Sequence, residues 1–339
     1  MLKGFLGTAL TIVALLGALP ACTTTASVPQ SSGYASNPQV QVFIKEMVAQ
    51  HGFSREELDK IFSQAQRRDD ILALMSKPVE KKLPWYEYRK IFLTQSRIEG
   101  GVAFWNQNAA ILDQAAKAYG VDAQVIVAII GVETRYGGNT GPYRVLDALS
   151  TLAFDYPPRG EFFRNELEQY LLLARAEHID LLNTKGSYAG AMGYGQFIPS
   201  SYQRFAVDFD HDGKRDLWDS PMDIVGSVAN YLHVHGWDPG AAVTIRANVT
   251  GDRFESVIEK GLKPDTAVKE LRTDGITPSI PLPDETLAAL LSLEQENGPE
   301  YWLGFNNFYV ITRYNHSPLY AMAVYQLSEE IRLARARMQ

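Results

Sequence analysis

The chain has 339 residues, of which 46% are hydrophobic and 21% charged, values typical of a globular protein large enough for more than one compact unit. Its formal net charge of −7, without a basic stripe, argues against a protein that binds nucleic acid. Aromatic residues make up 11% of the chain, which suits a saccharide-binding groove, although most of these rings are expected in the core.

The first 22 residues have the pattern of a signal peptide. Lys3 gives a positive start, an apolar stretch runs to Leu19, and the segment ends L-P-A-C. Such a short apolar run closed by a small residue is typical of a secretory signal rather than a membrane span. Cys22, the only cysteine, lies where a bacterial lipoprotein signal places its lipidated residue. Ordinary cleavage after Ala21, beside a chance cysteine, is the alternative.

An acylated Cys22 would anchor the protein to a membrane. The next residue is Thr23, whereas an aspartate at this position would resemble an inner-membrane retention signal. The threonine therefore favours attachment to the periplasmic face of the outer membrane. Residues 23–38 carry few large apolar groups and are predicted to form a flexible tether.

Beyond the tether, apolar residues recur at helical spacing along most of the chain. The first helix is expected near Val40, and Ser54 with Glu57 looks like a capping box for the next. Further helices are predicted over 79–119 with breaks, 123–136, 164–177, 200–206, 221–235 and 317–337.

Residues 239–305 have a different pattern. V-T-I-R-A-N-V alternates, Pro and Gly recur, and the stretch Y-W-L-G-F-N-N-F-Y-V-I carries aromatic residues typical of strands. The sequence therefore predicts a mainly α-helical protein with a small β-containing insert.

Glu133 ends the apolar run V-I-V-A-I-I-G-V. A carboxylate in such surroundings is costly unless it is paired, protonated or useful. As a structural residue it would pair with Arg135 or with a distant arginine. As a catalytic residue it would be partly desolvated, which raises the pKa of its carboxyl group and keeps it protonated as a general acid near neutral pH. The spacing alone leaves both interpretations open.

The stretch D-F-D-H-D-G-K-R-D-L-W-D begins at Asp208 and has the pattern of a calcium-binding loop. Its carboxylates fall at loop positions 1, 3, 5, 9 and 12, with Gly213 at position 6 for the sharp turn. The last of them, Asp219, is shorter than the usual glutamate, so Asp223 could close a longer loop instead. A plain acidic turn is the alternative.

The segment G-S-Y-A-G-A-M-G-Y-G-Q-F at 186–197 is rich in glycine, which lets the backbone approach a ligand closely. Tyr194 offers a face for sugar stacking, and Ser187 and Gln196 offer hydrogen bonds. A tight packing turn is equally compatible with this composition.

Three motifs, G-V-E-T-R-Y-G at 131–137, G-A-M-G-Y-G-Q-F at 190–197 and the aspartate loop at 208–223, resemble in order and spacing the membrane-bound lytic transglycosylase B family. The likeness continues in S-V-A-N-Y-L-H-V-H-G-W at 227–237 and R-Y-N-H-S-P-L-Y at 313–320. This resemblance implies a goose-type-lysozyme-like helical core with an additional helical region, a calcium loop, and peptidoglycan as substrate.

The resemblance also implies a role for each matched residue. Glu133 would be the single catalytic acid and base. Three residues would line the groove around the acetamido sugars: Ser187, Gln196 and Tyr231. Other positions of the groove would be lined by Tyr88, Arg159, Tyr314, Asn315 and Tyr320. A structural Ca²⁺, the only cofactor expected, would be held by Asp208, Asp210, Asp212 and the carbonyl of Lys214. The loop is one residue longer than the family pattern between Asp219 and Asp223, so either could supply the last ligand.

A single carboxylate differs from the pair that ordinary glycosidases use. The resemblance implies a lytic transglycosylase, which cleaves the β-1,4 MurNAc–GlcNAc bond without water and leaves 1,6-anhydroMurNAc. A hydrolytic muramidase and a non-catalytic peptidoglycan-binding lipoprotein are the alternatives. The predicted divisions are 1–22 signal peptide, 23–38 tether, 39–110 helical region, 111–238 catalytic core with the calcium loop 208–223, 239–305 β-containing region and 306–339 C-terminal return to the core.

Overall fold

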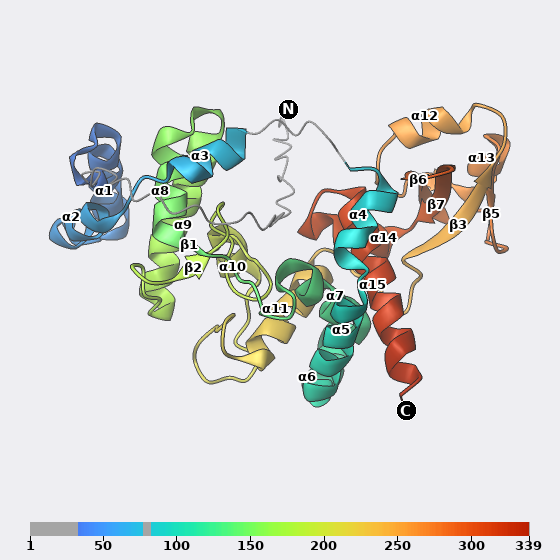
Figure 1. Ribbon diagram of the computed structural model, residues 1–339, viewed down its shortest axis with the longest axis horizontal. Helices are drawn as coiled ribbons and strands as arrows, with labels where there is room; N and C mark the ends of the chain where they lie inside the picture. The colour runs from blue at the N-terminus through green and yellow to red at the C-terminus, as the bar shows by residue number, and fades with distance from the viewer. Residues whose placement is uncertain (1–32, 77–82, 339) are drawn as a thin grey trace, which may run out of the picture. The chain divides into compact units, whose positions relative to one another are not determined.

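The computed structural model describes residues 33–76 and 83–338 and is mainly helical, as predicted (Figure 1). The signal peptide, Cys22 and most of the predicted tether lie outside the described residues. The described chain forms two compact units. We call them the α7 unit, which contains 83–138 and 205–338, and the α9 unit, which contains 33–76 and 139–204.

In the α7 unit, helices pack around one buried central helix, α7 (Ala123–Thr134). Its helices α5, α6, α11 and α15 all contact α7 (Figure 1). The helices around it are α4 (Trp85–Phe92), α5 (Gln95–Gln107), α6 (Ala109–Tyr119), α11 (Pro221–Val234), α14 (Asn306–Tyr314) and α15 (Pro318–Ala336). No single described helix is long and apolar enough to cross a membrane, while α6 and α7 would pass that test only as a pair bent by 113°.

The predicted β-containing insert is a five-stranded antiparallel sheet in the order β4-β6-β7-β3-β5. Apolar residues of the sheet, among them Leu290 and Leu303, form a small core with Val257 and Leu271 from two short helices. The elements are β3 (Thr244–Val249), α12 (Phe254–Glu259), β4 (Thr266–Ala267), α13 (Val268–Thr273), β5 (Ile276–Pro278), β6 (Leu287–Gln295) and β7 (Gly298–Gly304).

The aromatic stretch that follows from Tyr301 is only partly a strand. Strand β7 ends at Gly304, and N-N-F-Y-V-I belongs to helix α14. The buried Phe308 and Ile311 are three residues apart, which places them on one helical face. Asn307 donates to the carbonyls of Asp238 and Ala241, at 2.8 and 3.0 Å. Buried helical contacts therefore override the β-propensity of these aromatic residues.

In the α9 unit, α8 packs along α9, and α3 contacts α8. Ser54 caps α2, as predicted, by accepting a hydrogen bond from the backbone of Glu57. Helix α1 begins at Pro38, close to the predicted start near Val40, and in η1 before it the hydroxyl of the buried Tyr34 donates to Asp155. The elements are η1 (Tyr34–Ser36), α1 (Pro38–His51), α2 (Arg55–Gln64), α3 (Asp69–Ser76), β1 (Tyr143–Arg144), α8 (Val145–Asp155), η2 (Pro157–Arg159), α9 (Gly160–Glu177) and β2 (Lys185–Gly186), followed by α10 (Pro199–Phe205).

Candidate active site

Glu133 lies in the last turn of α7 and is the one partly exposed residue between Val125 and Thr134. The helix ends two residues earlier than predicted, because Arg135 and Tyr136 adopt left-handed conformations with φ of 53° and 59°. Within the described residues Glu133 forms no ion pair, so a structural pair with Arg135 is not found. The apolar helix therefore presents one carboxyl group at its end.

The carboxyl group of Glu133 is desolvated and hydrogen-bonded. Burial raises its pKa from 4.5 to about 7, against the opposing effect of a hydrogen bond from Tyr320. The Tyr320 hydroxyl donates to Oε1 at 2.6 Å. Since Oε1 accepts this bond, the acid proton of the neutral form belongs on Oε2. Near neutral pH the group can therefore act as a general acid and, once ionised, as a base.

Four tyrosines of the α7 unit lie near this end of the helix: three lie close to Glu133, and the fourth packs against one of them. Burial raises the pKa of Tyr88, Tyr314 and Tyr320, and the neighbouring Glu133 raises each of them further. The ring of Tyr231 lies 4.6 Å from that of Tyr314, and its hydroxyl donates to the carbonyl of Arg313 at 2.6 Å. The hydroxyls of Tyr88, Tyr314 and Tyr320 therefore remain neutral donors at any physiological pH, and the tyrosine ring faces can stack on sugars.

Two polar atoms beside this cluster are buried without a hydrogen-bond partner among the described residues: the hydroxyl of Tyr88 and Oδ1 of Asn315. Buried polar groups are normally paired, so unpaired ones at a candidate site are consistent with groups that bind a ligand. The structure thus brings together Glu133 and five predicted groove residues, Tyr88, Tyr231, Tyr314, Asn315 and Tyr320.

The α9 unit carries the other predicted groove residues, in its glycine-rich loop. The Ser187 hydroxyl accepts from the backbone of Ala191 at 3.0 Å, and Gln196 donates to the carbonyls of Thr140 and Gly193 at 3.1 and 3.0 Å. Gln196 itself has a positive φ of 50°. Ser187, Tyr194 and Gln196 are all partly exposed. The loop is therefore a fixed turn with polar groups still at its surface, rather than a packing turn alone.

Arg159, the remaining groove candidate, lies just before α9. Its guanidinium lies 4.4 Å from the ring centre of Phe162 and 5.2 Å from that of Phe163. Partial burial lowers its pKa, but the group remains a cation. This stacking holds the side chain at the start of the helix.

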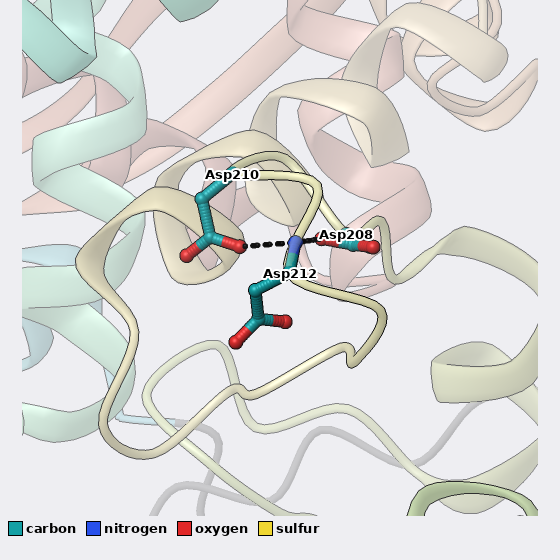
Figure 2. Close-up of side chains that lie close together, drawn as sticks. All are labelled: Asp208, Asp210 and Asp212. Carbon is teal, nitrogen blue, oxygen red and sulfur yellow. Dashed lines mark hydrogen bonds between the residues drawn. The ribbon is translucent and has the colours of Figure 1, made fainter.

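The acidic loop gathers three carboxylates, and Figure 2 shows them around one turn. One oxygen each of Asp208, Asp210 and Asp212 lies within 4.8 Å of the others. The backbone of Asp212 donates to both Asp208 and Asp210, at 3.0 and 3.3 Å (Figure 2). Gly213 has a φ of 93°, as the predicted sharp turn requires. Three hard oxygen donors in one tight loop suit a cation such as Ca²⁺.

The two residues predicted as alternative last ligands have different environments. Asp223 is buried, and its two carboxylate oxygens accept from the backbone of Phe209 at 2.7 Å and of Asp216 at 2.8 Å. Asp219 is exposed and lies outside the cluster of three. Asp223 is therefore held beside the loop by backbone hydrogen bonds. The Lys214 amide donates to Asp212 at 2.9 Å, within the same turn.

Comparisons with known proteins identify the family of this chain. A family model, the transglycosylase SLT domain, matches residues 35–329. Membrane-bound lytic murein transglycosylase B of Escherichia coli (strain K12) is 49% identical over 313 residues, 90% of this chain and 85% of that protein. Soluble lytic transglycosylase SltB1 from Pseudomonas aeruginosa is similar in structure, with TM-score 0.84, 50% identity, and 89% and 100% of the two chains covered.

A second solved structure is that of the Escherichia coli lytic transglycosylase Slt35 in complex with calcium. Its TM-score is 0.81 at 49% identity, over 89% of this chain and 95% of that one. Fold and comparisons together define a lytic transglycosylase with a lysozyme-like helical core. The chain belongs to the transglycosylase SLT domain family.

One residue with a clear structural role, Tyr136, was not predicted from the sequence. Tyr136 is half-buried against α5, and three glycines surround its ring. The adjacent pair Gly100-Gly101 inside a helix was the available signal, because glycine destabilises a helix interior unless close packing requires it.

Proposed function

We propose that this enzyme cleaves the β-1,4 bond between MurNAc and GlcNAc in peptidoglycan and forms 1,6-anhydroMurNAc, with Glu133 as acid and then base. The observation that carries the proposal is the desolvated carboxyl group of Glu133, with a pKa of about 7 and a hydrogen bond from Tyr320. The family assignment and the names of the relatives, which are murein transglycosylases, support the choice of substrate.

In the first step, Oε2 of Glu133 donates its proton to the glycosidic oxygen, and the bond from that oxygen to C1 of MurNAc breaks. The positive charge that develops at C1 is stabilised by the oxygen of the sugar's own N-acetyl group. This substrate assistance explains how one carboxyl group can serve in place of the usual pair. Tyr320 keeps its hydrogen bond to Oε1 throughout and fixes the orientation of the carboxyl group.

In the second step, the ionised Glu133 takes the proton from the C6 hydroxyl of the same MurNAc, whose oxygen then bonds to C1. The proton returns to Glu133, so the enzyme is regenerated and no water is consumed. A pKa of about 7 suits both steps, because neither the acid nor the base form is strongly favoured near neutral pH.

Sugar binding is proposed for the polar and aromatic groups of both units. In the α7 unit, Tyr88, Tyr231 and Tyr314 offer ring faces, and the unpaired Asn315 oxygen can accept a hydrogen bond. In the α9 unit, the partly exposed set consists of Ser187, Tyr194, Gln196 and Arg159.

We propose that the acidic loop binds a structural Ca²⁺ through Asp208, Asp210, Asp212 and the carbonyl of Lys214. The three clustered carboxylates and the calcium complex of Slt35 support this assignment. Bound Ca²⁺ would offset two of the three neighbouring negative charges and so stabilise the loop. Asp219 and Asp223 are the two candidates for a further ligand, and the existing hydrogen bonds of Asp223 make it the one already fixed at the loop.

We further propose that Cys22 is lipidated and anchors the enzyme to the periplasmic face of the outer membrane. The support is the L-P-A-C sequence at the end of the apolar leader and the membrane-bound character that the name of the Escherichia coli relative states.

The Glu133→Gln variant tests the assignment of the catalytic group. It keeps the shape of the side chain and removes the proton donor, so it should fold and bind sacculi but lose at least about 1,000-fold in rate. Glu168→Gln on α9, which removes the charge of a carboxylate that contacts His51, is the matched control and should retain activity. Activity of Glu133→Gln near that of the wild type would overturn the assignment. If the wild-type chain binds sacculi and releases nothing, it is a binding protein instead.

A further inference from the structure

We propose that Tyr136 is a positioning residue for Glu133, through a glycine-lined slot that fixes the turn at the end of α7. The inference rests on the proposed function, because it assigns to Tyr136 the task of orienting the group that transfers the proton.

The slot is built from glycines of two helices. A Cβ atom added to Gly131 of α7 would lie 2.6 Å from Cζ of Tyr136. One added to Gly101 of α5 would lie 2.7 Å from the Tyr136 hydroxyl, and one added to Gly100 would lie 2.9 Å from Cε2. Carbon atoms that close would clash, so only residues without a side chain leave room for this ring.

The ring is also held at its face and at its tip. Phe104 of α5 stacks on it, with ring centres 5.7 Å apart and planes 29° apart. The Tyr136 hydroxyl donates to the carbonyl of Arg97 at 2.8 Å. Burial raises the pKa of this hydroxyl, so it stays a neutral donor. The glycine slot, the stacked ring of Phe104 and the hydrogen bond of the hydroxyl together hold the Tyr136 side chain in one position.

The backbone at this point needs such a constraint. Two successive residues, Arg135 and Tyr136, adopt left-handed backbone conformations, which are rare for residues other than glycine. Their amides close the end of the helix by donating to the carbonyls of Gly131 at 3.1 Å and Ile130 at 3.3 Å. The favourable packing of the Tyr136 ring compensates for this strained conformation.

Glu133 lies inside this same turn. Its neighbour Thr134 donates to the carbonyl of Ile130 at 3.2 Å and accepts from Gly137 at 3.0 Å, which continues the network to the far side of Tyr136. A helix end without the anchored ring can unwind or continue as regular helix. Either change would rotate the last turn and move the carboxyl group away from Tyr320.

The test compares Tyr136→Ala, which empties the slot, with Tyr136→Phe, which keeps the ring and loses only the hydroxyl. Leu112→Ala is the matched control, because it opens a cavity at the buried face of α6, a helix that contributes none of the three glycines of the slot. For each variant kcat, KM and the pH dependence of kcat/KM are measured on soluble glycan fragments, below the melting temperature of the least stable protein.

We expect Tyr136→Ala to lose about 10- to 100-fold in kcat, with KM within about threefold, because a misplacement of about 1 Å at the reacting group costs this much. Its pH profile should also shift, since Glu133 would change its distances to the groups that face it, Tyr88 of α4, Tyr314 of α14 and Tyr320 of α15. Tyr136→Phe should stay within about fivefold of the wild type, which shows rescue by the ring.

The inference is overturned if Tyr136→Ala matches Leu112→Ala in kcat and pH profile, since Tyr136 would then matter for stability alone. Should Tyr136→Ala fail to fold, Tyr136→Leu replaces it, with the same two outcomes. Failure of the proposed function gives different results, whatever the Tyr136 variants do: Glu133→Gln would be active, the wild-type chain would release nothing from sacculi, or its products would carry reducing ends.

Discussion

The Tyr320 hydroxyl lies 2.6 Å from Oε1 of Glu133 and joins the C-terminal helix α15 to the end of α7, across 187 positions of the chain. This contact lowers the pKa of Glu133 while burial raises it, and burial is the larger effect. The pKa of the candidate acid is therefore set by two opposing causes, of which one can be removed by a single substitution.

Tyr320→Phe should move the alkaline limb of the pH–rate profile to higher pH. Without the hydrogen bond the carboxylate loses a stabilising donor, so the pKa of Glu133 rises above about 7. The rate at neutral pH should fall by roughly 10-fold or more, because the carboxyl group is also less well oriented. Tyr325→Phe on the same helix is the control. A limb that stays in place or moves to lower pH would show that Tyr320 does not act on Glu133.

Glu133→Gln should stabilise the protein at alkaline pH. The pKa of Glu133 is 4.5 unfolded and about 7 folded, so the folded state binds more protons between these pH values. Stability is therefore lost as pH rises through this window, and the loss is complete above about 7. Relative to the wild type, the variant should gain about 3 kcal/mol at pH 8 and little at pH 4, measured by urea unfolding. An equal difference at both pH values would contradict the raised pKa.

Calcium should raise the melting temperature of the wild-type chain. A ligand that binds only the folded state stabilises it by about 3 kcal/mol at 100 times its dissociation constant. We expect a shift of several degrees in differential scanning fluorimetry, reversed by a chelator. Asp210→Asn should abolish most of the shift, whereas the exposed Asp252→Asn in the β-containing region should leave it unchanged. An equal shift in both variants would exclude the acidic loop as the calcium site.

The size of the remaining shift also separates the two candidates for the last ligand. Asp219→Asn should leave the calcium response intact if the exposed Asp219 takes no part. Asp223→Asn should weaken the response and also destabilise the calcium-free protein, because two backbone amides lose their acceptor charge.

Cys22 should be labelled by a fatty-acid probe when the full chain is expressed in a Gram-negative host. Cys22→Ser should abolish the label and release the enzyme into the soluble periplasmic fraction, since one acylated cysteine supplies the anchor. Persistent labelling of the serine variant would show that the lipid is attached elsewhere, and labelling of neither protein would favour ordinary signal cleavage.

Helices with one apolar face or a continuous apolar run were predictable, because periodicity and caps are local signals. The core helix α7, which contains Glu133, and the cap at Ser54 are examples. The stretch from Asn306 was misleading, because β-propensity is local while the burial of Phe308 and Ile311 that makes it helical is not. Local patterns thus predicted most helices, but they could not predict the long-range contacts that decide between helix and strand.

The candidate site was predictable in part for the same reason. An acid at the end of an apolar run and an aspartate loop are visible in sequence, as are glycines in a short segment. The bond from Tyr320 to Glu133 joins residues 187 positions apart and was not predicted, because the family resemblance placed Tyr320 only among the groove residues. The slot for Tyr136 needs Gly100, Gly101 and Gly131 from two helices, which no local pattern brings together.

The most direct test of the account is the mass of the products released from intact sacculi by the purified chain lacking residues 1–22. The expected products are fragments that end in 1,6-anhydroMurNAc, without the water molecule that hydrolysis would add, and Glu133→Gln should release none. Fragments one water heavier, with reducing ends, would contradict it. They would make the enzyme a muramidase, and a group that activates water beside Glu133 would then have to be found.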